Sequence, residues 1–324
     1  MDNQAQLSWE ARFARLAAAS AFLGIAFQIA SFVVQLPALA DAPGRNDALR
    51  YRETLLNFED HSGVLLGSAI MQGIGTFFAA GALFYLFRAT RHRRVELPRF
   101  VQWVVPLAPV LITVAVIANW AGLKDATDQY TKPGATADAK AKLNNDERKD
   151  IADYCRDHAR GASALRACRA GRSRQEAVAK KLVQDNQGAL GAGALFGGTI
   201  ALAFAYVIIS LNAMRAGLLS RFMGILGIIV GALIVLPLLP QGVPIVQIFW
   251  LAALGMLFLG YWPGGRGPAW ETGEATPWPA PQRAMLQQRS DEEPERDDLD
   301  EPEPDEEPEE PHPVSKKRKR KRRR

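Results

Sequence analysis

The chain has 324 residues, 48% of them hydrophobic and 23% charged, and its formal net charge at pH 7 is +5. Length alone would predict two soluble domains, but the apolar residues gather into long uncharged stretches that exclude this interpretation. The net charge is an average over opposed acidic and basic blocks, so it indicates no partner by itself.

Six stretches of the sequence are long, apolar and free of charged side chains. A helix needs about 20 mostly apolar residues to cross the hydrocarbon core of a bilayer, and it satisfies its own backbone hydrogen bonds there. The sequence therefore predicts an all-α fold, a polytopic transmembrane six-helix bundle within residues 1–262. The predicted spans are residues 16–39, 63–87, 100–123, 189–214, 222–239 and 243–262.

The distribution of basic residues predicts how these spans are oriented, because short cytoplasmic loops carry an excess of Lys and Arg. With the N-terminus inside, ten arginines fall in cytoplasmic segments and three fall in the short outside loops. We therefore expect a cell-membrane protein with both termini in the cytoplasm and the loop 124–188 outside. A cleaved signal peptide ending at Ala38-Leu39-Ala40 is the alternative for the first span.

No Asp, Glu, Lys, Arg or His lies within a predicted span. Gln28 and Gln72 are expected at middle depth of neighbouring helices, where they either bond to each other or form part of a substrate site. The lack of these five residue types argues against a proton-coupled transporter, but it leaves a facilitator for a neutral solute open. Pro106 and Pro109 interrupt the third span and are expected to bend it near its cytoplasmic end.

Small residues recur in the spans at the spacing of helix-packing motifs. Gly193 and Gly197 form one such pair, and Gly227 and Gly231 form another. Without the bulk of a Cβ atom, two helix backbones can approach closely. These pairs indicate either a dimer interface or packing inside one bundle, and the second is favoured because any bundle needs such faces.

Residues 48–61, in the first outside loop, mix leucines and Phe58 with charged side chains. This pattern favours a helix that lies at the membrane interface. His61 stands beside two carboxylates, but no Ser or Cys nucleophile pattern accompanies it. We interpret it as a solvated loop histidine.

The extracytoplasmic loop 124–188 is predicted to be helical over residues 138–159. A second helix is expected to begin near Ala164 and to continue into the fourth span. The loop contains both cysteines of the chain, Cys155 and Cys168. Because thiols outside the cytosol tend to oxidise, a disulfide between the two loop helices is favoured over two free thiols.

The segment 263–324 is predicted to be a disordered cytoplasmic tail. Residues 291–310 contain 14 acidic residues and repeated proline, and such a segment cannot bury enough apolar surface to fold. The last nine residues are all basic, and they would contact anionic lipid headgroups or the acidic run, with nucleic acid less favoured. They are Lys316, Lys317, Arg318, Lys319, Arg320, Lys321, Arg322, Arg323 and Arg324.

Two stretches carry a resemblance to known proteins. Residues 213–227, AMRAGLLSRFMGILG, join the fourth and fifth spans, and PAWETG at 268–273 with PWP at 277–279 follows the sixth. Both resemble a group of uncharacterised multi-pass membrane proteins of actinobacterial type, and the resemblance covers residues 12–279. It implies an integral membrane location and a six-helix layout, and it offers no catalytic residue to transfer.

Three classes of function stay open on the sequence. The motifs HExxH, GxSxG and GxxxxGK are absent from it, and His158 alone does not complete a metal site. We expect neither a cofactor nor a metal, and we favour a non-enzymatic membrane protein whose tail contacts anionic lipids or partners. A facilitator for a neutral small solute is the second interpretation, and a membrane-embedded enzyme is the third.

Overall fold

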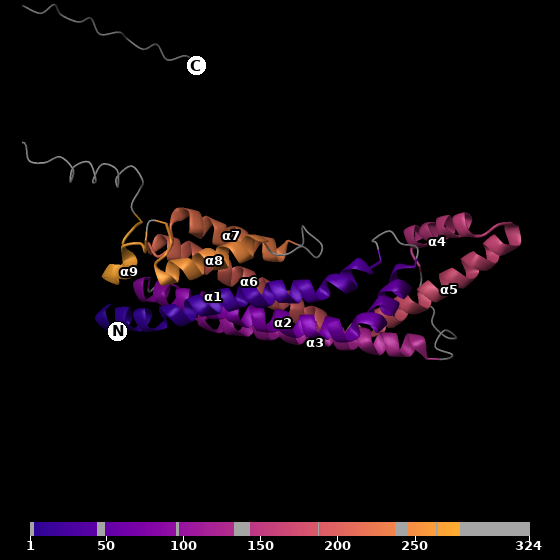
Figure 1. The fold of residues 1–324 in the computed structure, drawn as a ribbon, viewed down its shortest axis with the longest axis horizontal. Coiled ribbons are helices and arrows are strands. Elements are labelled where there is room, and N and C mark those ends of the chain that lie inside the picture. Colours follow the sequence, from indigo (N-terminus) through magenta and orange to yellow (C-terminus); the bar gives the residue numbers. More distant parts are fainter. Residues whose placement is uncertain are drawn as a thin grey trace, which may run out of the picture. The chain divides into compact units, whose positions relative to one another are not determined.

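Every regular element in the described part of the chain is a helix (Figure 1). The computed structural model describes residues 3–43, 49–94, 97–132, 143–186, 188–236, 245–263 and 265–278. The chain divides into two units, residues 1–278 and 279–324, and the second unit lies outside the described residues. The helices are α1 (Asn3–Ala40), α2 (Arg50–Arg93), α3 (Val101–Thr131), α4 (Asn145–His158), α5 (Ala162–Asn186), α6 (Ala189–Arg215), α7 (Arg221–Val235), α8 (Ile245–Leu259) and α9 (Ala269–Thr272).

Four of these helices are long and apolar enough to cross a membrane: α1, α2, α3 and residues 191–215 of α6. The helices α7 and α8 are equally apolar but have 15 residues each, which corresponds to about 22 Å against a hydrocarbon core of about 30 Å. The predicted spans 222–239 and 243–262 extend past them into residues 237–244, which lie outside the described part. The structure therefore supports a membrane-spanning helical protein with four candidate spans.

The longest helix, α2, reaches well beyond the predicted second span. Its 44 residues correspond to about 66 Å, more than twice the hydrocarbon thickness. The helix expected at 48–61 is present from Arg50 onward, and it is continuous with the second span as the first turns of α2. Its Leu55 packs against Ala126 of α3 and Val183 of α5. These contacts make a short stalk of three helices beyond the apolar part of α2.

Small residues allow close packing of α1 on α2 and of α6 on α7. A methyl group on Gly24 would lie 3.2 Å from the carbonyl oxygen of Gly75, and one on Gly231 would lie 2.8 Å from that of Ala203. The Gly227–Gly231 pair is thus used inside the bundle. By contrast, Gly193 and Gly197 face open space in this chain.

The helices α4 and α5 form a hairpin whose turn contains Gly161, at a φ of +95° that favours glycine. The α4 helix begins with a reciprocal cap between Asn144 and Glu147. The expected run of the second loop helix into the fourth span is wrong, because α5 ends at Asn186 and α6 begins anew at Ala189. Gly188 stands between them in an extended conformation (φ −61°, ψ 137°).

Residues 265–278, here called the strap, belong to the helical unit and not to a tail. Trp270 is 7% exposed and joins the main hydrophobic core, and its indole N–H donates to the carbonyl of Leu218 at 2.9 Å. The sequence-based boundary at residue 262 is therefore too early, because this tryptophan gives the segment enough apolar surface to pack. The predicted disordered part from residue 279 onward lies outside the described residues.

Candidate functional site

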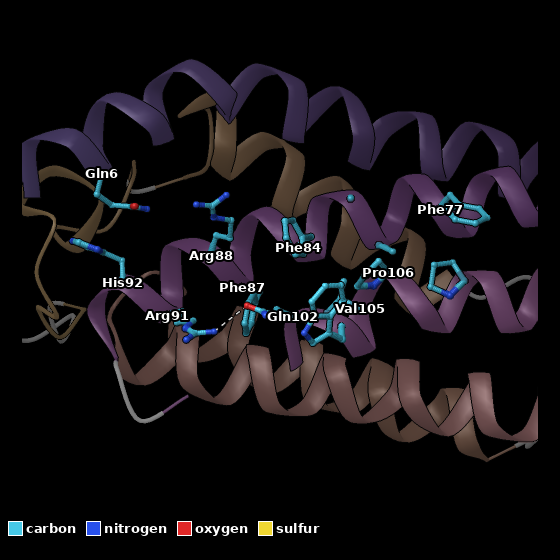
Figure 2. Close-up of a pocket in the computed structure, with 14 residues that line it drawn as sticks. Gln6, Phe77, Phe84, Phe87, Arg88, Arg91, His92, Gln102, Val105 and Pro106 are labelled. Atoms are coloured by element: carbon cyan, nitrogen blue, oxygen red, sulfur yellow. Dashed lines mark hydrogen bonds between the residues drawn. The ribbon is translucent and has the colours of Figure 1, made fainter. Parts of the chain in front are cut away.

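A cavity of about 1000 Å³ lies among the first three helices, and we call it the groove (Figure 2). One residue of α1 contributes to its lining, and the rest comes from the C-terminal half of α2 and the first turns of α3. The lining residues are Gln6, Phe77, Ala80, Gly81, Phe84, Phe87, Arg88, Arg91, His92, Gln102, Trp103, Val105, Pro106 and Pro109.

The helical repeat explains why these residues share one wall. In α2, Phe77, Phe84, Arg88 and Arg91 are separated by seven, four and three positions, so they lie along one face of the helix. The distance along the helix from Phe77 to Arg91 is about 21 Å. The groove is therefore elongated, and its lining side chains change from apolar at Phe77 to cationic at Arg91 (Figure 2).

Two arginines and a histidine form the polar end of the groove. The Arg91 Nη1 donates to the side-chain oxygen of Gln102 at 3.2 Å, and the Arg88 guanidinium lies 4.7 Å from the ring centre of Trp9. The His92 Nε2 is 3.1 Å from the Oδ1 of Asn3. Neither Arg88 nor Arg91 forms a salt bridge with a residue in the described part of the chain.

A neighbouring arginine, Arg93, is buried and bonds to other residues of the protein, so it does not face the groove. Its side chain is buried against the buried carboxylate of Glu10, with Nη2 and Oε2 3.0 Å apart. The same guanidinium donates to the carbonyl of Ala269 in the strap, at 3.0 Å from Nε and 2.7 Å from Nη2. This pair joins α1, α2 and the strap, and sequence analysis missed it because its members lie outside the uncharged spans, 83 positions apart.

The apolar wall of the groove combines exposed aromatic side chains with two prolines. Phe77 is 45% exposed and Trp103 is 70% exposed, which leaves this wall open at the side of the protein. Pro106 and Pro109 have no N–H to donate to the carbonyls four residues earlier, those of Gln102 and Val105. The prolines thus leave two backbone acceptors beside the groove, in addition to the bend predicted from the sequence.

Comparison with protein-family models, with curated proteins and with solved structures gives no match. The sequence resemblance to actinobacterial membrane proteins therefore stays an expectation, and the site has to be interpreted from its own geometry. That geometry provides cationic donors at one end and apolar surface along the rest. It is suited to holding an amphiphilic molecule.

The two glutamines singled out in the spans are not joined by a hydrogen bond in the structure. Gln72 is exposed on α2, whereas the side-chain oxygen of Gln28 is buried without a hydrogen-bond partner. Gly75 of α2 approaches the backbone of Gln28 instead. A site built from both glutamines stays a hypothesis, and the structure contributes to it a single unsatisfied oxygen.

The other predicted site residues lie far from the groove in sequence. The structure joins Cys155 and Cys168 as a disulfide, with 5.9 Å between their Cα atoms. The presence of this bridge in the purified protein stays a prediction to be tested. The basic segment 316–324 lies outside the described residues. Within the described residues, no group of three or more His, Cys, Asp or Glu side chains is placed to hold a metal ion.

Proposed function

We propose that this protein is a non-enzymatic, multi-pass protein of the cell membrane that holds a lipid-like amphiphile in its groove. The observation that carries the proposal is the change along the length of the groove, from arginine at one end to aromatic and proline side chains over the rest. Such a gradient matches a molecule with a polar head and an apolar chain, because each part meets surface of its own kind.

The dimensions of the groove support this proposal. Half of a bilayer's hydrocarbon core is about 15 Å thick, and the groove extends about 21 Å along α2. A lipid of the adjoining leaflet would therefore place its head near Arg91 while its chain reaches past Phe77. The acyl chain would then cover the exposed side chains of Phe77 and Trp103.

The orientation of the protein is part of the same proposal. We infer six spans with both termini in the cytoplasm, with α7 and α8 as the described parts of the last two. The excess of arginine at the C-terminal end of α2 then places the polar end of the groove in the cytoplasmic leaflet. The basic segment 316–324 would contact anionic lipids on the same side.

Native mass spectrometry of the detergent-purified protein tests the proposal. We expect one retained amphiphile per chain, and we expect Phe77→Ala with Trp103→Ala to lower its occupancy several-fold, because both side chains line the groove. The matched control is Leu195→Ala with Phe196→Ala, which removes comparable exposed apolar side chains from α6. A wild-type protein that carries no amphiphile, or an equal loss in both variants, would contradict the proposal.

A further inference from the structure

We propose that the ligand of the groove is an anionic phospholipid, whose phosphate is bound between Arg88 and Arg91. This inference rests on the proposed function and adds the chemical class of the headgroup. It depends on the charges at the polar end of the groove, on how the two arginines are held, and on the length of the apolar wall.

The polar end of the groove has an excess of positive charge. Its lining contains Arg88, Arg91 and His92 but no Asp or Glu. The nearby carboxylate of Glu10 does not neutralise these groups, because both its oxygens bond to Arg93 and one also accepts from Gln6. Two guanidinium groups therefore face the cavity without a carboxylate partner in the described part of the chain.

The two arginines are positioned in advance of binding. They are three positions apart on α2 and line the groove from two sides, because Arg88 reaches toward α1 and Arg91 reaches toward α3. Gln102 holds the Arg91 guanidinium through a single hydrogen bond, and the Arg88 guanidinium lies over the ring of Trp9 in a cation–π contact. Each guanidinium carries five N–H donors, so most of them stay available for the oxygens of a phosphate.

The apolar wall favours a phospholipid over a free phosphate ion. Beyond the arginines, the cavity is lined by Phe84, Phe77 and the two prolines of α3, and none of these side chains offers a donor to a small anion. An acyl chain attached to the phosphate would fill this part of the groove and add burial of apolar surface. We therefore infer that the head and at least one chain bind together.

The test uses the full chain in lipid nanodiscs that contain a phosphatidylglycerol and a phosphatidylcholine with identical acyl chains. After transfer to detergent, native mass spectrometry reports which of the two lipids the protein retains. Both lipids carry the phosphate, so the preference comes from the quaternary ammonium of phosphatidylcholine, which the two arginines repel. We expect a several-fold preference for the anionic lipid. Arg88→Gln with Arg91→Gln should bring the preference close to one, while the total occupancy of the groove persists.

The matched control is Arg12→Gln with Arg15→Gln, which removes two exposed arginines of α1 that do not line the groove. This control should keep the preference for phosphatidylglycerol, and monodisperse elution of each variant shows that it is folded. A retained lipid without headgroup preference overturns this inference and leaves the proposed function intact. A preference that survives in the Arg88 and Arg91 variant also overturns it, because the selectivity then comes from elsewhere.

Glycerol phosphate provides the last arm of the test. An excess of this soluble headgroup should displace little of the retained phosphatidylglycerol, because it lacks the chain that the apolar wall requires. Complete displacement at millimolar concentration would show that the site binds phosphate alone, and it would overturn the assignment to a lipid. Absence of any retained amphiphile would instead remove the proposed function together with this inference.

Discussion

A buried glutamate from another helix lies at each end of α2, and the two carboxylates are stabilised in different ways. At the N-terminal end, Glu176 of α5 accepts the backbone N–H groups of Tyr51 and Arg52, at 2.8 Å and 3.2 Å. At the C-terminal end, Glu10 of α1 pairs with the guanidinium of Arg93. One end is thus fastened by backbone donors and the other by an ion pair.

The chemistry of a helix terminus explains this difference. The first N–H groups of a helix have no partner within it, and the residue that precedes α2, Leu49, has no side-chain acceptor to offer them. A carboxylate from another helix can supply this cap and also meets the positive end of the helix dipole. At the C-terminal end the orphan groups are carbonyls, of which that of Thr90 accepts from the backbone N–H of Arg94. The guanidinium of Arg93 donates to the carbonyl of Ala89, one turn earlier, and to that of Ala269 in the strap.

The largest effect is expected when the ion pair is broken. Arg93→Ala would leave the carboxylate of Glu10 buried without its cation, which costs about 3–5 kcal/mol in comparable buried pairs. The free energy of unfolding, or the melting temperature in detergent, should fall accordingly, and the strap should lose its contact at Ala269. Arg12→Ala, at an exposed position of α1, should change little. Equal stability of the two variants would mean that the pair does not fasten this end.

The sequence predicted much of the membrane part and little of what fastens its ends. Uncharged stretches of about 24 residues located α1, α2, α3 and α6, because the hydrocarbon core imposes both length and composition. The pair of Glu10 and Arg93 left no local signal, since residues so far apart in sequence meet through the packing of α1 on α2. The strap had one signal, the tryptophans Trp270 and Trp278 in an otherwise polar segment.

The groove was hidden in the sequence for a related reason. Its apolar wall belongs to helices that are apolar on every side, so periodicity does not distinguish a lipid-facing side chain from a groove-lining one. Arg88 and Arg91 entered the sequence analysis as orientation signals, and only their placement beside Gln102 and Trp9 relates them to a cavity. In the same way, the second loop helix was predicted to continue into the fourth span, whereas α5 ends at Asn186.

The second expected effect is confined to the hairpin end. Removing the bridge with Cys155→Ser and Cys168→Ser opens a loop with a sequence separation of 13, and loop entropy predicts a local loss of about 3 kcal/mol. Amide exchange in α4 and the first half of α5 should accelerate, whereas exchange in α1 should not change. Ala167→Ser, on an exposed position of α5, is the control. Rapid alkylation of both thiols in the untreated native protein would show that the bridge is absent.

The smallest effect distinguishes the two glutamates by pH. Burial raises the pKa of the Glu176 carboxyl, with smaller opposing contributions from its hydrogen bonds to the backbone of Tyr51 and Arg52. Because the folded state then binds the proton more tightly than the unfolded chain does, the stabilising contribution is full below the ordinary carboxyl pKa and is lost as pH rises through the raised value.

Glu176→Gln keeps one acceptor for the α2 cap but removes the titration. We therefore expect the melting temperature to fall more in the wild type than in Glu176→Gln as the pH rises from about 4, near the ordinary carboxyl pKa, to about 8. Parallel pH profiles would indicate that Glu176 stays ionised in both states, so that this end of α2 would also be held by a permanent charge.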